Sequence, residues 1–256
     1  MKQNYKQQLH EAKNNWLSKK FIAHRGLWDN QEIIENTLPA FQNAINHNYA
    51  IELDVWRIKD GTLVVYHDDT LKRLCGIDKK ICDVESVEEL KSYSIFEKEK
   101  IPTFDEFLEL VNSQTQILVE IKTYEFNGKT EELIYNRLKN YSGDYAIESF
   151  NCYSVYWFKK NAPHIFRGQL SAYFEDDKKI SFLMKNIKKG VKTLFFNKFT
   201  KPHFVAYDKN KFPNKYISKA QKQGLPILLW TIKNQEEYLS FKDKIDNVIF
   251  DTFLIE

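Results

Sequence analysis

Short apolar segments alternate with longer amphipathic segments along most of this chain, and this alternation limits the possible folds more than any other feature. The apolar segments predict eight strands, at Phe21–Ala23, Ala50–Val55, Gln116–Ile121, Tyr145–Phe150, Arg167–Leu170, Thr193–Asn197, Pro226–Thr231 and Asn247–Asp251. The amphipathic segments predict helices at Thr37–His47, Thr103–Val111, Thr130–Tyr141, Tyr153–Lys160, Lys178–Lys188, Tyr216–Gln223 and Gln235–Phe241. Eight successive βα units predict an α/β fold that closes into a (β/α)8, or TIM, barrel. An open sheet of fewer strands is the alternative, because Arg167–Leu170 is a weak strand.

The spacing of the expected strands is irregular at one place. Residues 56–115 separate the second expected strand from the third, and within them Asp60-Gly61 is a turn-forming dipeptide followed by the extended run TLVVYH. Residues 57–100 therefore predict a small insertion with its own hairpin after the second strand. Residues 1–20 predict a short helix packed outside the barrel. We expect residues 1–256 to form one domain, since α/β barrels of about 200–250 residues do so.

Composition excludes several classes of protein. The chain is 43% hydrophobic and carries a formal net charge of +3, which is typical of a globular protein. Its longest apolar run, Leu225–Trp230, is much shorter than the ~18–20 residues of a membrane span, so we expect no transmembrane segment. The polar N-terminal residues lack the apolar core of a secretory signal. Three scattered cysteines, Cys75, Cys82 and Cys152, indicate a reducing cytoplasm rather than a disulfide scaffold.

Positive charge is concentrated in the second half of the chain. Between Asn151 and Leu225, fifteen lysines and Arg167 occur with four acidic residues, which is a local net charge of +12. Such a segment can attract an anionic substrate or a membrane surface. The helical spacing of the lysines favours ordinary solvated helix faces. No basic stripe accompanies a recognisable nucleic-acid-binding module, so we expect no nucleic-acid partner.

Acidic residues occur inside segments that should form buried strands. Glu52 and Asp54 are two residues apart in one expected strand, so their side chains leave the same face. Glu120 and Lys122 share a face in the same way. A lone buried carboxylate is unfavourable unless it is paired or binds a metal. The alternatives are a structural Lys–Glu pair and a site for a divalent cation, Mg2+ or Ca2+, both of which prefer oxygen ligands.

His24-Arg25-Gly26 directly follows the first expected strand, at the end where barrel active sites lie. Arginine offers a planar pair of donors for phosphate or carboxylate, and glycine lets a ligand approach the backbone closely. His67 ends the TLVVYH run and is followed by Asp68 and Asp69. Each histidine alone also fits a structural or surface role. Their presence with an acidic trio and an arginine in one fold favours a shared active site.

Six motifs occur in order over the first half of the chain, and two more occur later. They are AHRG (Ala23–Gly26), ENTLPAF (Glu35–Phe41), ELDV (Glu52–Val55), DGTLVVYHDDTLKR (Asp60–Arg73), IPTFDEFLEL (Ile101–Leu110), LVEIK (Leu118–Lys122), SF (Ser149-Phe150) and LLWTI (Leu228–Ile232). In this order and spacing the chain resembles the glycerophosphodiester phosphodiesterases, a TIM-barrel family with a small insertion after the second strand.

The resemblance implies roles for ten residues, divided into an acid/base pair, metal ligands, substrate-binding residues and supporting residues. In that order they are His24 and His67; Glu52, Asp54 and Glu120; Arg25, Lys122 and the pocket aromatic Trp230; and Glu35 and Asn36. Either histidine can be the base, and His67 can instead join the metal ligands. The nucleophile is either water or a glycerol hydroxyl of the substrate, the latter giving a cyclic phosphate.

The implied function is metal-dependent hydrolysis of small glycerophosphodiesters to glycerol 3-phosphate and an alcohol, in the lipid and glycerol metabolism of the cytoplasm. Three departures from the family pattern concern substrate choice: Leu27–Ile34 lacks a usual proline, Glu148 replaces a small residue, and the ending VIFDTFLIE fits only loosely.

Two other functions remain as alternatives. A lysophospholipase D, or a phosphodiesterase of glycerol-phosphate polymers, is favoured by the basic second half and by Trp28, Trp56 and Tyr124 near strand ends. A catalytically silent barrel that binds phosphate esters is the other. The headgroup and the oligomeric state are left open by the sequence.

Overall fold

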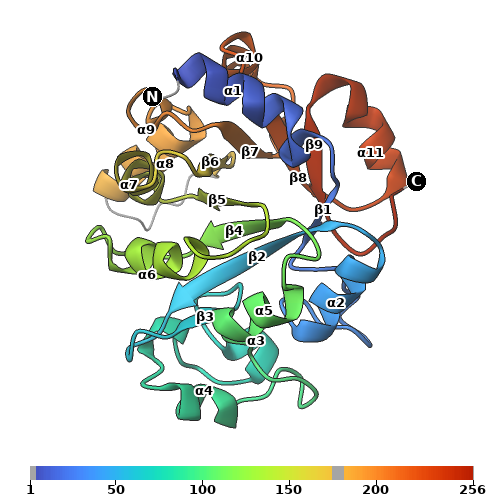
Figure 1. Cartoon of the computed structure of the whole chain (residues 1–256), viewed down its shortest axis with the longest axis vertical. Helices are drawn as coiled ribbons and strands as arrows, with labels where there is room; N and C mark the ends of the chain where they lie inside the picture. The colour runs from blue at the N-terminus through green and yellow to red at the C-terminus, as the bar shows by residue number, and fades with distance from the viewer. Residues whose placement is uncertain (1–3, 175–181, 256) are drawn as a thin grey trace. The chain divides into compact units, whose positions relative to one another are not determined.

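The computed structural model describes residues 4–174 and 182–255 of the chain. Within them, eight parallel strands alternate with helices, which is the architecture of a (β/α)8, or TIM, barrel (Figure 1). The predicted fold class is therefore confirmed, and the open-sheet alternative is wrong. The described chain consists of two compact units. The first unit is Ile22–Tyr145 with Asp251–Phe253, and the second contains Met1–Phe21, Ala146–Phe250 and Leu254–Glu256.

Three parallel strands form the sheet of the first unit. They are β1 (Ile22–His24), β2 (Ala50–Arg57) and β4 (Ile117–Ile121), and β2 pairs with both of the others. Their helices are α2 (Leu38–Asn46), α5 (Phe104–Val111) and α6 (Lys129–Leu138). A capping box fixes the start of α5, because Thr103 and Glu106 satisfy each other's backbone N–H groups.

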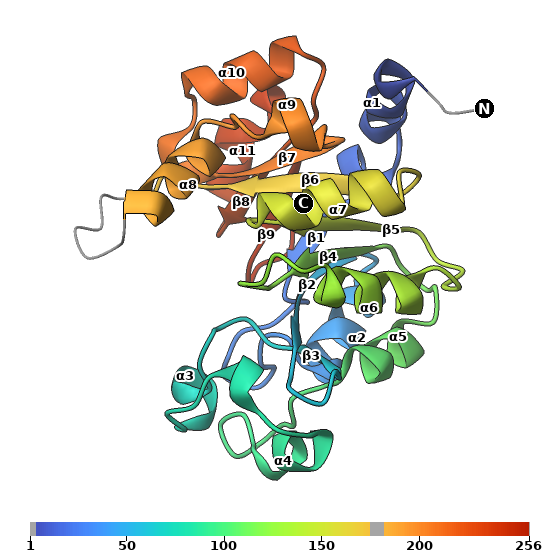
Figure 2. The ribbon, with the colours of Figure 1, turned by 90° about the vertical axis from the view of Figure 1, so that its left-hand side faces the viewer.

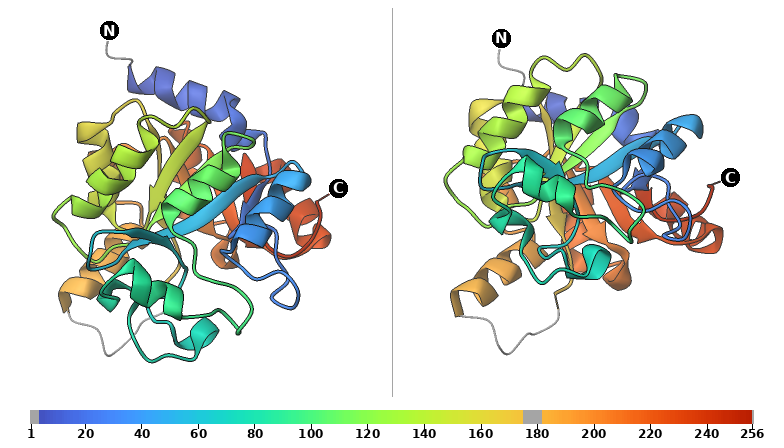
Figure 3. Two further views of the ribbon diagram at one scale, coloured as in Figure 1. Left: turned by 60° about the horizontal axis from the view of Figure 1, so that its bottom comes forward. Right: turned by 90° about the horizontal axis from the view of Figure 1, so that it is seen from below.

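The predicted insertion after the second barrel strand is present and has its own small core. Strand β3 (Leu63–Val65) runs antiparallel to the end of β2, which confirms the hairpin around Asp60-Gly61. Two helices follow, α3 (Lys72–Cys75) and α4 (Val87–Ser92), with a 3-10 turn at Ile81–Asp83. The views of Figure 3 show this insertion, in teal, beyond the carboxyl end of β2. Its buried apolar residues include Ile58, Val64, Tyr66, Leu71, Leu74, Ile81 and Leu90.

Five consecutive parallel strands form the sheet of the second unit. They are β5 (Tyr145–Ser149), β6 (Phe166–Ser171), β7 (Phe204–Asp208), β8 (Ile227–Ile232) and β9 (Asn247–Phe250). The helices are α1 (Tyr5–Asn14), α7 (Cys152–Asn161), α8 (Phe182–Lys192), α9 (Asn197–Thr200), α10 (Lys215–Lys222) and α11 (Gln235–Phe241). The helix predicted near the N-terminus is α1, and its Tyr5 hydroxyl donates to the Pro202 carbonyl at 2.6 Å.

One predicted strand is wrong. Thr193–Asn197 continues the turns that end α8, since the Thr193 amide donates to the Lys189 carbonyl and the Phe195 amide to that of Gly190. The strand of this βα unit is instead Phe204–Asp208. A short apolar run is compatible with either a strand or a helix end. In this chain its backbone amides bond to carbonyls of α8, so it forms the end of that helix. Part of the helix predicted at Lys178–Lys188 lies outside the described residues.

No helix among the described residues combines the length and the apolar character needed to cross a bilayer.

Candidate active site

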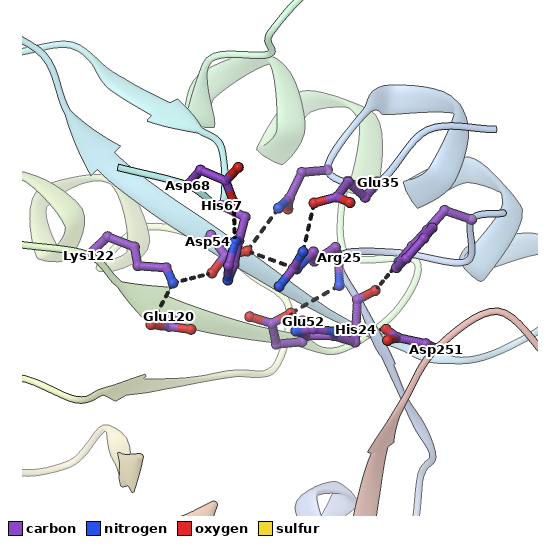
Figure 4. A network of polar contacts seen from close by, with 12 residues as sticks. His24, Arg25, Glu35, Glu52, Asp54, His67, Asp68, Glu120, Lys122 and Asp251 are labelled. Carbon is purple, nitrogen blue, oxygen red and sulfur yellow. Dashed lines mark hydrogen bonds and ion pairs between the residues drawn. The ribbon is translucent and has the colours of Figure 1, made fainter. Parts of the chain in front are cut away.

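Most of the predicted site residues lie together at the carboxyl ends of the first unit's strands. His24 ends β1, Glu52 and Asp54 lie on β2, and Glu120 lies on β4 (Figure 4). This is the end of the strands on which active sites of (β/α)8 barrels are built.

The three acidic residues form a compact buried cluster. Glu52 and Asp54 point to the same face of β2, and Asp54 lies opposite Glu120 in the strand register. One carboxylate oxygen of each residue lies within 4.8 Å of those of the other two, and all three side chains are buried. Three oxygen donors at this spacing can hold a divalent cation.

Lys122 neutralises only part of the negative charge of this cluster. Its Nζ lies 3.0 Å from Asp54 Oδ1 and 3.1 Å from Glu120 Oε1. Burial raises the pKa of Asp54, but Lys122, His67 and Arg25 outweigh it and lower that pKa well below its usual range. Burial and the charge of Asp54 raise the pKa of Glu120 to about 7, against the attraction of Lys122. A buried carboxylate whose pKa is raised in this way fits a site that takes up further positive charge, such as a hard divalent cation.

The His24 imidazole is held by a carboxylate. Its Nδ1 lies 2.6 Å from Oδ1 of Asp251, which follows β9 and belongs to the first unit. Its Nε2 lies 4.0 Å from Glu52 Oε2. A carboxylate at Nδ1 fixes the tautomer that carries the proton there and orients the ring, leaving Nε2 directed toward the acidic cluster.

The His67 imidazole has a similar partner. Its Nδ1 lies 2.7 Å from Asp68 Oδ1, and Arg73 Nε donates to Asp68 Oδ2 at 2.7 Å. Burial, together with the charges of Lys122 and Arg25, lowers the pKa of His67 below its usual value, although Asp54 and the Asp68 hydrogen bond act to raise it. The imidazole is therefore neutral at pH 7, which is the state a general base requires.

Arg25 lies between the acidic cluster and Glu35. Its backbone N–H donates to Glu52 Oε2 at 3.0 Å, and Nη1 donates to Glu35 Oε1 at 2.7 Å. Asn36 donates from Nδ2 to Asp54 Oδ2 at 2.8 Å. Arg25 and Asn36 both adopt left-handed backbone conformations, with φ of 60° and 55°. Such strain in non-glycine residues is typical of functional sites.

Gly26 has a structural role in the loop that follows β1. Its φ is +81°, and a Cβ at this position would lie 2.8 Å from the backbone carbonyl carbon of Ala40 in α2. The glycine therefore lets the loop after β1 approach α2 closely. The expected approach of a ligand to this backbone stays a prediction.

Glu35 is a buried carboxylate at the centre of a network of cations. It accepts from Arg25, from both Nη atoms of Arg73 and from Asn30 Nδ2. Burial alone would raise its pKa, but the Arg73 hydrogen bonds and the Arg25 charge lower it to about 2. Glu35 thus stabilises the folded protein above pH 4.5, and this stabilisation is lost as the pH falls toward 2.

The Glu35→Gln variant is expected to be about 3 kcal/mol less stable than the parent at pH 7, because two arginines lose their buried partner. The difference should shrink as the pH falls from 4.5 toward 2, and chemical denaturation across that range measures it. Glu109→Gln, at an exposed position, is the matched control. Equal stability of the parent and Glu35→Gln at pH 7 would contradict this account of the network.

Trp230 lies on β8, in the second unit. Its ring packs edge-on against that of Phe150, with ring centroids 5.8 Å apart. Both residues lie in segments that the sequence had related to strands of the family, namely SF and LLWTI. The role of Trp230 in binding glycerol stays a prediction.

Sequence reasoning missed the residues that hold the two imidazoles. Asp251 is 227 positions from His24, so their pairing follows from the fold alone. The signal available was its position directly after a barrel strand, where polar side chains enter the active-site face. Asp68 directly follows His67 and carried no specific signal. Arg73 joins Asp68 to Glu35, and its motif position alone did not indicate this link.

A hollow of about 420 Å3 adjoins the site. Lys122 lines it together with Trp56, Arg57 and Tyr124, and the Trp56 and Tyr124 rings lie 5.4 Å apart. Arg57 is neutralised by Glu125 at 2.7 Å. The hollow therefore offers aromatic surface next to Lys122 of the buried charged cluster.

Known proteins resemble this chain in sequence and in fold. The sequence profile of the glycerophosphoryl diester phosphodiesterase family matches residues 24–253. A glycerophosphodiester phosphodiesterase of Caldanaerobacter subterraneus is 38% identical over 162 residues, covering 58% of this chain and 65% of that protein. One of Bacillus altitudinis is 34% identical over 160 residues, covering 57% and 64% respectively, so each match spans just under two thirds of the relative.

A solved structure has the same fold. It is a phosphodiesterase of Oleispira antarctica in complex with its product sn-glycerol-3-phosphate, at 23% identity and a TM-score of 0.74, with 91% of this chain and 92% of that chain covered. The profile match covers residues 24–253, which is most of the chain. This chain therefore belongs to the glycerophosphoryl diester phosphodiesterase family.

Proposed function

We propose that this protein is a metal-dependent glycerophosphodiester phosphodiesterase, which releases glycerol 3-phosphate and an alcohol from small water-soluble diesters. One observation carries the proposal: the acidic trio Glu52, Asp54 and Glu120 lies in one cluster with Arg25, Lys122 and two carboxylate-bound imidazoles. Such a combination fits hydrolysis of an anionic ester, in which negative charge must be neutralised and protons must be moved. The predicted cytoplasmic role in lipid and glycerol metabolism stays part of this proposal.

Glu52, Asp54 and Glu120 would hold the divalent cation, Mg2+ or Ca2+. When bound, the cation supplies Lewis-acid polarisation of a nonbridging phosphoryl oxygen. The raised pKa of Glu120 supports this assignment, because an added cation would let this buried carboxylate ionise. His67 would remain outside the ligand set in this proposal, because the group of donor atoms within 4.8 Å of one another among the described residues belongs to Glu52, Asp54 and Glu120.

Arg25 and Lys122 would stabilise the negative charge that grows on the phosphoryl oxygens. Both cations are nearly buried and are fixed by carboxylates before substrate arrives, Arg25 by Glu35 and Lys122 by Asp54 and Glu120. Fixed donors of this kind require little reorganisation during the reaction, which is the main source of electrostatic catalysis.

The two histidines would divide the proton transfers between them. The lowered pKa of His67 supports its role as the base that takes a proton from the attacking hydroxyl group. His24, oriented by Asp251 at Nδ1, would protonate the departing alkoxide. This assignment goes beyond the sequence, which left the two roles interchangeable.

The hollow beside Lys122 supports a small diester as the substrate. Trp56 and Tyr124 offer aromatic surface that suits the cationic headgroup of glycerophosphocholine or glycerophosphoethanolamine. A lysophospholipase D is the second candidate, favoured by the exposed side chains of Tyr124 and Phe126, over which an acyl chain could extend. A silent binding protein is disfavoured, because the acidic trio and both imidazoles are assembled together.

A panel of glycerophosphodiesters, assayed for glycerol 3-phosphate release with and without EDTA, tests the proposal. We expect release from glycerophosphocholine or glycerophosphoethanolamine that stops with EDTA and returns when Mg2+ or Ca2+ is added. Faster cleavage of lysophosphatidylcholine would select the second candidate. Diester binding by calorimetry without any product would select the silent barrel.

The Asp251→Asn variant is expected to reduce kcat by about 10- to 100-fold with little change in KM, because the amide no longer fixes the His24 tautomer. Steady-state kinetics on glycerophosphocholine measures kcat and KM separately. Asp243→Asn, at an exposed position near the C-terminus, controls for the loss of charge. If the Asp251→Glu variant retains activity that Asp251→Asn loses, this supports a role of the carboxylate in positioning the His24 ring. An unchanged kcat in Asp251→Asn would remove Asp251 from the catalytic arrangement.

A further inference from the structure

A groove in the second unit has no place in the proposed reaction. It is a hollow of about 790 Å3 lined by residues of α1, of the segment that follows α8, and of α10. Figure 2 shows α1, α9 and α10 in the upper part of the ribbon. Lys201 and Leu225, which line it, lie directly before β7 and β8. The groove is therefore at the amino ends of these strands, whereas barrel active sites are built from carboxyl ends.

The charge of the groove is of one sign. Fifteen residues line it, and these include five lysines and no acidic residue. The lysines are all exposed: Lys6, Lys198, Lys201, Lys215 and Lys219. No carboxylate of the described residues lies within ion-pair distance of their ammonium groups, although lysines elsewhere, such as Lys59 and Lys91, have such partners.

The floor and one rim of the groove are apolar. Leu9, Ala220 and Leu225 are buried beneath it. At the rim, Phe195 and Phe199 are 52% and 53% exposed, and the Lys198 ammonium lies 3.7 Å and 4.7 Å from their ring centroids. Exposed aromatic rings that accompany lysines are typical of surfaces at the boundary between water and lipid.

From this combination we infer that the groove and its rim dock on the surface of an anionic phospholipid bilayer. The lysines bind lipid phosphates, and Phe195 and Phe199 enter the headgroup layer. Charge complementarity selects an anionic surface, because the five ammonium groups have no carboxylate partners among the described residues. The aliphatic floor favours a bilayer over a nucleic acid, because aliphatic side chains neither stack on bases nor bind phosphates.

Vesicle sedimentation with the full chain tests this inference. We expect binding to vesicles of phosphatidylcholine with phosphatidylglycerol, and little binding to phosphatidylcholine alone. The triple variant Lys198→Ala, Lys201→Ala, Lys215→Ala should bind about 100-fold more weakly, at about fivefold for each lysine. A control triple variant, Lys233→Ala, Lys242→Ala, Lys244→Ala, removes the same charge at exposed positions outside the groove and should bind nearly as the parent does.

The aromatic rim provides a second variant that leaves the charge unchanged. Phe195→Ser with Phe199→Ser should weaken vesicle binding, whereas Phe96→Ser, at a position 43% exposed in the first unit, should not. Hydrolysis of glycerophosphocholine in solution should stay at the parent rate in all of these variants, so this test is separate from that of the proposed function.

Three results would overturn the inference. One is equal binding to vesicles with and without phosphatidylglycerol. Another is equal loss of binding in the groove and control triple variants. The third is binding of polyuridylate or polyglutamate, but not of anionic vesicles, with the groove lysines required, which would assign the groove to a nucleic acid or an acidic protein.

Discussion

His24→Ala and His67→Ala should each lower kcat for glycerophosphocholine by about 100- to 10,000-fold, the range of general acid–base catalysis. The reason is that each imidazole is held at Nδ1 by a carboxylate and keeps Nε2 for proton transfer. Purified variants assayed for glycerol 3-phosphate release provide the measurement. His47→Ala, at an exposed position at the end of α2, is the matched control and should retain the parent rate.

The leaving group distinguishes the roles of the two histidines. A nitrophenolate leaves without a proton, so a glycerophosphate ester of nitrophenol should largely restore the activity of His24→Ala. The same substrate should not restore His67→Ala, because the attacking hydroxyl group still needs a base. Rescue of His67→Ala instead would exchange the two roles. Near-parent activity of either variant on glycerophosphocholine would remove that histidine from the mechanism.

Removal of the divalent cation should reduce turnover by about a thousandfold or more, because Lewis-acid stabilisation supplies several kcal/mol of the lowered barrier. Glu52→Gln and Glu120→Gln should weaken cation binding and raise the Mg2+ or Ca2+ concentration needed for activity. Glu132→Gln, at an exposed position in α6, should leave that concentration unchanged. Full activity after exhaustive chelation would contradict the assignment of the acidic trio.

Cation binding should also release protons near neutral pH. The pKa of Glu120 is raised to about 7, so about half of these side chains are protonated at pH 7 and must ionise when a cation binds. Calorimetric titration in buffers of different ionisation enthalpy counts the released protons. The number should fall as the pH rises above 7, and Glu120→Gln should release none.

The acidic trio could be predicted from the sequence because it depends on local periodicity. Glu52 and Asp54 share a face of β2 since strand side chains alternate, and parallel pairing of β2 with β4 places Glu120 beside Asp54. The positions of His24 and Arg25 follow in the same way from the end of β1. These features belong to single strands, or to strands that are neighbours in a barrel.

The supporting residues could not be predicted because they depend on contacts distant in sequence or on the insertion. Asp251 reaches His24 from the other end of the chain, and Arg73 reaches Glu35 from α3 of the insertion. The false strand at Thr193–Asn197 has a different cause. Its residues are apolar enough for a strand, but the turns that end α8 satisfy their backbone groups and expose Phe195 in the groove.

Anomalous diffraction from crystals soaked in Mn2+ tests the central claim most directly, because Mn2+ is a hard cation that takes the same oxygen ligands as Mg2+. We predict one strong peak about 2.0–2.6 Å from carboxylate oxygens of Glu52, Asp54 and Glu120. The peak should disappear in Glu120→Gln crystals soaked in the same way. A peak elsewhere, or density in which Lys122 alone fills the space between the three carboxylates at saturating Mn2+, would contradict the account.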